Sequence, residues 1–166
     1  MNKHVSMKTK SFNNLLVFAL FGIALYFFGV LYEGVVYGPK MMDTSMDRML
    51  FWKDFTSIIS PVIYYVPVVY LATIVLPILY FKTANENTVL KNQLKWASIL
   101  QISSMILTIY ILSQINFKMS FGDLEKYADA IPGKVIVFNL LSTLRIILAA
   151  IALMLTFRAY TIIIKA

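Results

Sequence analysis

The stretch Val135–Phe157 reads VIVFNLLSTLRIILAAIALMLTF and contains one charged residue, Arg145. A helix that crosses a bilayer needs roughly 20 apolar residues, so this run is long enough to span a membrane. At about 1.5 Å per residue, Arg145 lies on the order of 15 Å along the helix from Val135. A charge at that depth costs at least about 3 kcal/mol and normally faces protein or water, where it has a partner. The run therefore predicts a transmembrane helix, with Arg145 as the leading candidate for a functional residue.

The composition predicts an integral membrane protein with one domain, residues 1–166. The chain is 60% hydrophobic and 14% charged, with a mean hydropathy of +0.76, whereas a soluble domain is about half apolar and a quarter charged. It contains no cysteine, which excludes disulfides, thiolate catalysis and iron–sulfur ligation. The single histidine, His4, lies in the N-terminal tail. We therefore expect no cofactor and no metal.

The net charge of +7 comes mostly from lysines that flank the apolar runs. Such lysines are typical of residues that set membrane topology and contact anionic lipids. A nucleic-acid-binding surface would need clustered basic residues interleaved with aromatic ones, and the sequence contains no such cluster. The lipid bilayer is thus an expected partner, and nucleic acid is not.

Four apolar runs predict an all-α, polytopic four-helix bundle, with spans at about 15–37, 60–81, 96–117 and 135–157. The first run is too long for a signal-peptide core, so we expect a retained span. Ser60-Pro61 is a helix-start signal for the second. Between these two, apolar residues recur at helical spacing among charged ones: Met46, Met49, Leu50, Phe55 and Ile58. This pattern favours a short interfacial helix, with a re-entrant segment as the alternative.

Four spans put both termini on one side of the membrane. With the termini inside, eight basic residues lie inside and six outside. The inner set is Lys3, Lys8, Lys10, Lys82, Lys91, Lys95, Arg158 and Lys165, and the outer set is Lys40, Arg48, Lys53, Lys118, Lys126 and Lys134. Because positive residues favour the cytoplasmic side, we expect a bacterial inner (cytoplasmic) membrane protein with both termini cytoplasmic.

Three of the predicted helices have one face of small and polar residues, which in membranes is typical of helix–helix contacts. At 100° per residue the faces are Ser142, Arg145, Ala149, Ala152 and Thr156; Gly22, Tyr26, Gly29 and Glu33; and Ala97, Gln101, Ser104 and Thr108. They predict an interior site in which Glu33 and Arg145 form a direct or bridged ion pair, although Glu33 lies nearer the surface. The pair could be a structural tie, or Arg145 could hold an anionic or carbonyl group of a ligand.

Two further residues complete the candidate ligand-binding set, which is Arg145, Glu33, Asn139, Tyr26, Gln101 and Tyr64. Asn139 lies about 120° around the helix from Arg145, so it could bond a different neighbour. Pro67 and Pro77 should kink the second span. The kink could open a pocket beside Tyr64, Tyr65 and Tyr70, or simply bend a helix with interfacial tyrosines.

The segment FNLLSTLRIILAAIAL, Phe138–Leu153, resembles the last span of the anthrone oxygenase-like family of small four-helix membrane proteins, DUF1772. Members often carry an aromatic–Asn pair, a polar residue and Arg, which correspond here to Phe138-Asn139, Thr143 and Arg145. The segments GVLYEGVVYGP, residues 29–39, and Ser60-Pro61 fit the same layout. The chain departs from the family where many members carry a histidine, here Ser142. If that histidine takes part in the family's chemistry, this chain lacks the activity.

Three functions are compatible with these patterns. The first is a protein of unassigned activity that holds a small apolar or lipid-like molecule at a polar site around Arg145. The second, implied by the resemblance, is a cofactor-free oxidoreductase acting on an aromatic or quinone-like substrate. There Arg145 and Asn139 would stabilise an enolate or phenolate, with Glu33 or a tyrosine as base. The third is a structural or assembly partner that uses its small-residue faces in a homo-oligomer.

Overall fold

The computed structural model describes the chain except residues 1–2, 41, 59–61, 116–125, 127–129 and 166. The described elements are all helical. They are α1 (Lys3–Tyr32), the π-helix η1 (Glu33–Tyr37), α2 (Gly38–Lys40), α3 (Met46–Ile58), α4 (Val62–Lys82), α5 (Thr88–Ile111) and α7 (Ile131–Ile164). The prediction of an all-α protein is confirmed.

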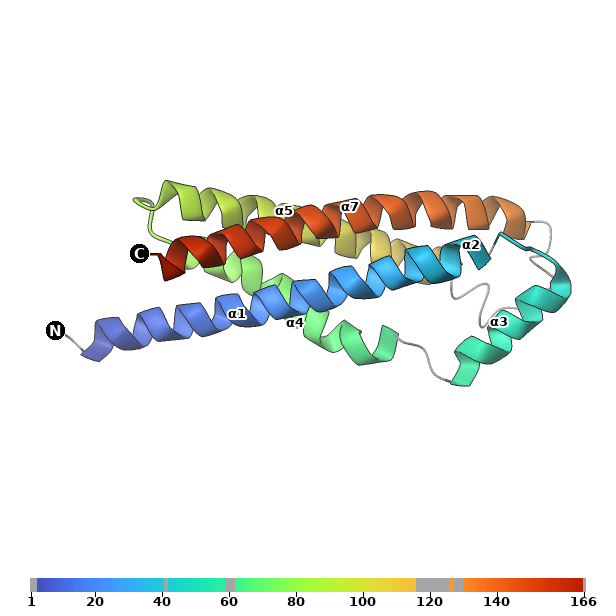
Figure 1. Ribbon diagram of the computed structural model, residues 1–166, viewed down its shortest axis with the longest axis horizontal. Coiled ribbons are helices and arrows are strands. Elements are labelled where there is room, and N and C mark those ends of the chain that lie inside the picture. The colour runs from blue at the N-terminus through green and yellow to red at the C-terminus, as the bar shows by residue number, and fades with distance from the viewer. Residues whose placement is uncertain (1–2, 41, 59–61, 116–125, 127–129, 166) are drawn as a thin grey trace.

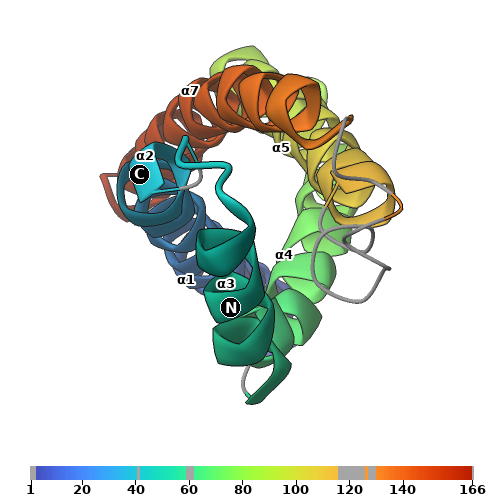
Figure 2. The same ribbon diagram turned by 90° about the vertical axis from the view of Figure 1, so that its right-hand side faces the viewer.

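The helices α1, α4, α5 and α7 run antiparallel to their neighbours along one axis (Figure 1). Viewed along that axis, they form a ring in which α1 packs against α4 and α7, and α5 packs against the same two helices (Figure 2). Both chain termini and the α4–α5 connection lie at one end, called here the terminal end (Figure 1). The opposite, distal end carries η1, α2 and α3.

Among the described residues, three helical segments are long and apolar enough to cross a membrane: Lys10–Tyr37 (28 residues), Thr88–Ile115 (28 residues) and Ile131–Ile164 (34 residues). A shorter apolar stretch, Val66–Lys82, belongs to α4. The helix α4 bends along its length in Figure 1, as expected from Pro67 and Pro77 within it. These features are those of a membrane protein.

The helices extend beyond the apolar runs that predicted them, because polar flanking residues continue the helical backbone. The helix α5 begins at Thr88, where the side chain of Asn87 accepts the N–H of Leu90 at 3.2 Å. The helix α7 begins at Ile131, with Pro132 in its first turn, where a missing N–H breaks no helical hydrogen bond. The helices therefore begin several residues before the apolar runs at these ends.

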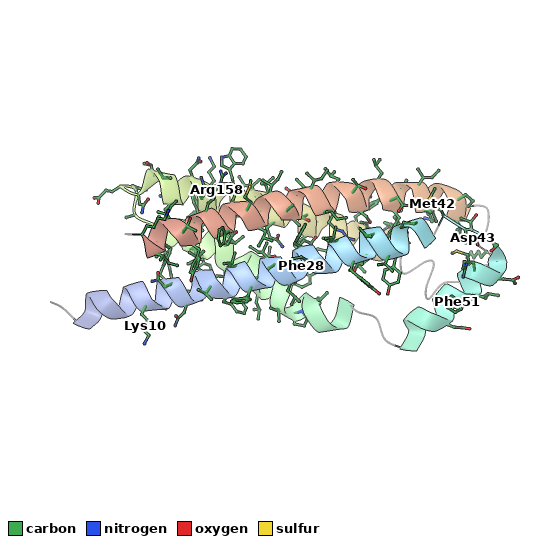
Figure 3. The ribbon with its side chains drawn as sticks, in the orientation of Figure 1. Lys10, Phe28, Met42, Asp43, Phe51 and Arg158 are labelled. Carbon is green, nitrogen blue, oxygen red and sulfur yellow. The ribbon has the colours of Figure 1, made fainter. Side chains whose placement is uncertain are left out.

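Many large apolar side chains lie on the outside of the ring, whereas small and polar side chains are buried inside it together with leucines and isoleucines. Phe28, halfway along the bundle in Figure 3, is 62% exposed. At Gly22, by contrast, a Cβ would collide with the Cβ of Ala72, so α1 and α4 approach closely there. All the residues of the predicted faces on α5 and α7 are buried, as are Gly22, Tyr26 and Glu33 on the α1 face. The predicted interior faces are confirmed in these positions.

The helix α3 lies obliquely across the distal end (Figure 1). Its Met49 is buried against α5 and α7 in a cluster with Ile111, Ile115, Ile131, Val135 and Phe138. Leu50 and Phe51 are exposed on the same helix, as are Asp47 and Arg48. The predicted short helix between the first two spans is therefore present, and it exposes apolar and charged side chains together.

Candidate functional site

Arg145 and Glu33 form a direct ion pair in the interior. The Nη2 atom of Arg145 donates to Oε2 of Glu33 at 2.7 Å, and the two side chains are only 2% and 10% exposed. Long helical side chains lean toward the N-terminus of their helix, which for α7 is the distal end (Figure 1). The guanidinium therefore reaches toward Glu33, and this closes the difference in depth between the two residues that the sequence suggested.

A π-helix carries Glu33. Gly38 donates its backbone N–H to the carbonyl of Glu33, five residues earlier, so the turn holds one residue more than an α-turn. A Cβ on Gly34 would press on Ile146 Cδ1, and one on Gly38 would press on Asn139 Oδ1. The two glycines thus let the π-turn pack closely against α7 beside the ion pair. Single-turn π segments are frequent at functional sites.

Tyr26 links α1 to α5, which face each other across the ring (Figure 2). Its hydroxyl lies 2.8 Å from Ser104 Oγ and 2.6 Å from Thr108 Oγ1, and it donates to the carbonyl of Ser104 at 3.0 Å. Ser104 Oγ in turn donates to the carbonyl of Arg145 at 3.1 Å. Tyr26 is therefore connected to the backbone of Arg145 through Ser104, and one polar network joins α1, α5 and α7.

Gln101 and Thr73 extend the polar interior to the fourth helix. Nε2 of Gln101 donates to Thr73 Oγ1 at 3.3 Å, and that hydroxyl donates to the carbonyl of Val69 at 2.8 Å. Thr73 was missed from the sequence because a single threonine in the apolar α4 gives no periodic signal. Hydrogen-bonded polar side chains in the interior therefore come from all four long helices.

Asn139 is not part of this network. Its Nδ2 donates to the sulfur of Met42 at 3.3 Å, and Met42 lies at the distal end in Figure 3. The prediction that Asn139 and Arg145 bond different neighbours is confirmed. Their contacts therefore give no support to a joint role of the two side chains. The side chain of Tyr64 lies outside the described residues.

Three buried polar atoms in the interior have no hydrogen-bond partner within the described part of the chain. They are Arg145 Nε, Ser142 Oγ and Gln101 Oε1. Their residues are 1%, 1% and 0% exposed. A buried polar group left without a partner costs about 1–3 kcal/mol, so native proteins rarely retain one without a ligand, a water or a functional reason.

The chemistry available at this site is that of charge and hydrogen bonding. In the described ranges, no group of three or more His, Asp or Glu side chains comes together as a metal site would require. The site offers one guanidinium, one carboxylate, several hydroxyls and one amide, in an interior lined otherwise by Val30, Val69, Met105 and Ala149. These groups are hydrogen-bond donors and acceptors of the kind that contact oxygen-bearing groups.

No model of a known protein family matches the chain, and no match is found among curated proteins or solved structures. The resemblance to the anthrone oxygenase-like family therefore stays a prediction. Function has to be inferred from the geometry of the interior.

Proposed function

We propose that the protein is a four-span integral membrane protein of a bacterial inner membrane, with both termini cytoplasmic and α3 on the outer surface. Three helices have the length to cross a bilayer, and α4 completes the ring between α1 and α5. Lys10 and Arg158 lie toward the terminal end in Figure 3, where positive charge favours the cytoplasmic side. Exposed Leu50 and Phe51 on α3 would enter the headgroup region.

We further propose that the bundle holds a small apolar or lipid-like molecule at the polar site around Arg145. The observation that carries this proposal is the pair of unpartnered donors, Arg145 Nε and Ser142 Oγ, in a fully buried interior. A buried ion pair by itself is weak evidence for stability, since desolvation can exceed the attraction. A ligand that accepts these hydrogen bonds would offset part of that desolvation.

The test is mass spectrometry of small molecules that co-purify with the wild type and with Arg145→Ala. Arg158→Ala is the matched control, because Arg158 is exposed and lies away from the site. We expect one compound to be lost in Arg145→Ala and retained in Arg158→Ala. Identical profiles in all three proteins would contradict the proposal.

A second variant protects this test against misfolding. Arg145→Ala leaves Glu33 as a buried charge without its counter-ion, whereas Glu33→Gln/Arg145→Met removes both charges and keeps much of the volume. Such replacements are often neutral or stabilising. The double variant should therefore fold and still lose the compound.

A structural tie is the second candidate function for the pair. The supporting observation is the 2.7 Å contact itself, which joins η1 to α7 without any bridging group. With this role alone, Arg145→Ala would lower the thermal stability while the co-purified molecules stayed the same. A homo-oligomer would have to use other surfaces, because most residues of the small-residue faces are buried between the helices of one chain; crosslinking in native membranes tests whether such an oligomer forms.

Oxygenase-like chemistry is the enzymatic alternative. It is supported by a guanidinium and a carboxylate in contact inside an apolar bundle, where both stabilisation of an anion and proton transfer could occur. It is weakened because Asn139, the other expected anion-stabilising group, is bonded to Met42. Oxygen consumption with an anthrone as substrate, lost in Glu33→Gln, would favour this alternative.

A further inference from the structure

Ser142 behaves differently from the other buried hydroxyls. Within the described ranges, each of the others donates to a carbonyl: Thr73, Thr83, Ser98, Ser104, Thr108 and Thr156. Most of them use the carbonyl four residues earlier in their own helix, which is the usual way to satisfy a buried hydroxyl. Ser142 is 1% exposed, yet its Oγ makes no such bond.

By helical spacing, the Ser142 hydroxyl and the Arg145 side chain belong to the same face of α7. Residues three apart in a helix are neighbours on one face, and the Arg145 side chain leans back over the turn that contains Ser142. The Nε–H of Arg145 is not used by the ion pair, which runs through Nη2. Two hydrogen-bond donors from α7 are therefore available at the same level of the bundle.

The charge at this level is already balanced, because the guanidinium faces the carboxylate of Glu33 at 2.7 Å. An anionic ligand at the two donors would bring a second negative charge close to Glu33. In an interior of low dielectric, such like-charge repulsion is strong. A neutral acceptor makes the same hydrogen bonds without that repulsion.

We infer that the site takes an uncharged molecule through a carbonyl oxygen, of an ester or a ketone, that accepts from Arg145 Nε and Ser142 Oγ together. A carbonyl oxygen has two lone pairs and can accept both bonds. The inference rests on the proposed function and narrows its ligand to neutral carbonyl compounds. The carbonyl can belong to the ester of a bilayer lipid or to a free apolar compound.

The test uses the full chain in bilayers of ether-linked phosphatidylcholine, which contain no carbonyl. Methyl oleate labelled with ¹³C at its carbonyl is titrated in, and oleate and oleyl alcohol are titrated as the anionic and carbonyl-free counterparts. We expect a saturable downfield shift of the methyl oleate carbonyl signal and weaker binding of both counterparts. Replacing the host lipid with a ¹³C-ester phosphatidylcholine then distinguishes the sources, because a lipid-derived carbonyl gives the same shift without methyl oleate.

Two matched variants assign the donor. Ser142→Ala should weaken methyl oleate binding about fivefold, the change that corresponds to about 1 kcal/mol for one hydrogen bond. Ser98→Ala is the control, since its buried hydroxyl is bonded to Leu94 within its own helix, and it should bind as the wild type does.

The outcomes separate the two proposals. Tighter binding of oleate than of methyl oleate would overturn the neutral carbonyl class and leave the ligand site standing. Equal binding to the wild type and to Ser142→Ala would overturn the role of Ser142. No saturable binding of any probe, including the ester lipid, together with no co-purified compound, would overturn the ligand site as well.

Discussion

The terminal part of the bundle and its centre are held together in different ways. Toward the terminal end, Leu16, Leu76, Leu79 and Leu94 pack with small residues such as Ala159 in an apolar cluster. In the centre, the contacts are an ion pair and hydroxyl hydrogen bonds among Tyr26, Glu33, Ser104, Thr108 and Arg145. Apolar packing tolerates small changes of shape, whereas a buried charge tolerates no loss of its partner. We therefore expect the loss of one charge in the centre to destabilise the protein more than a small change of shape in the terminal cluster.

The largest expected effect comes from removing one charge of the central pair. Arg145→Leu should destabilise the protein by about 3–5 kcal/mol, because Glu33 would remain as a buried carboxylate without its counter-ion. Glu33→Gln/Arg145→Met should recover most of that loss. Thermal unfolding in detergent measures both, and equal loss in the two variants would mean that the pair stabilises the fold in its own right.

The next largest loss of stability is expected from a substitution that disturbs the close packing of α1 on α4. Gly22→Ala should destabilise by about 1–3 kcal/mol, because the added Cβ collides with Ala72 and forces the helices apart. Gly133→Ala is the control: its added Cβ meets no atom within 4 Å beyond its chain neighbours and the nearby backbone of its own helix, and in a helix Ala is favoured over Gly by about 0.5–1 kcal/mol. The same thermal unfolding assay compares the two variants, and an equal change of stability in both would argue against a tight contact at Gly22.

A smaller loss of stability is expected from removing the hydrogen bonds that cross the ring. Tyr26→Phe removes the hydroxyl that contacts Ser104 and Thr108, and should cost about 1 kcal/mol. Tyr70→Phe is the control, since Tyr70 is 39% exposed on the outside. Unfolding of both variants gives the difference, and a cost at Tyr70 equal to that at Tyr26 would contradict the assigned network.

The smallest effect concerns the start of α3. Hydrogen bonds from the Ser45 hydroxyl and N–H, followed by the charge of Arg48, lower the pKa of Asp43 below its ordinary 3.8. Because this carboxyl has its lower pKa in the folded protein, the stabilisation is complete above the ordinary value and is lost as pH falls through the lowered one. The protection of the Ser45 amide, measured against its intrinsic exchange rate at each pH, should therefore fall only under acid, and Asp43→Asn should abolish that pH dependence of protection.

Helix faces could be predicted from the sequence because burial follows the helical period. The stripe that contains Ser142, Arg145 and Ala149 is buried as expected. The partner of Arg145 could also be predicted, since Glu33 is the one acidic residue in the expected spans. Residue type and spacing were enough to predict both the buried face and the ion pair.

Contacts that depend on how the helices are offset could not be predicted. The bond from Asn139 to Met42 depends on where α2 ends relative to α7, and the π-turn at Glu33 changes the register without a periodic signal. The missing partner of Ser142 is visible only once every neighbouring carbonyl has been located. The Glu33–Arg145 pair was thus predictable from residue type, whereas a pairing that depends on the offset of the helices, such as Asn139 with Met42, was not.

The residues that face outward are different from the residues that make the internal ion pair and hydrogen bonds. Phe21, Phe28 and Leu140 are 71%, 62% and 70% exposed, whereas the central ion pair and hydroxyl network are made by inward-facing residues. Rewriting such exterior positions as Glu, Lys and Gln should give a water-soluble analogue with the same internal hydrogen bonds. The interior could then be studied in water, without lipid or detergent.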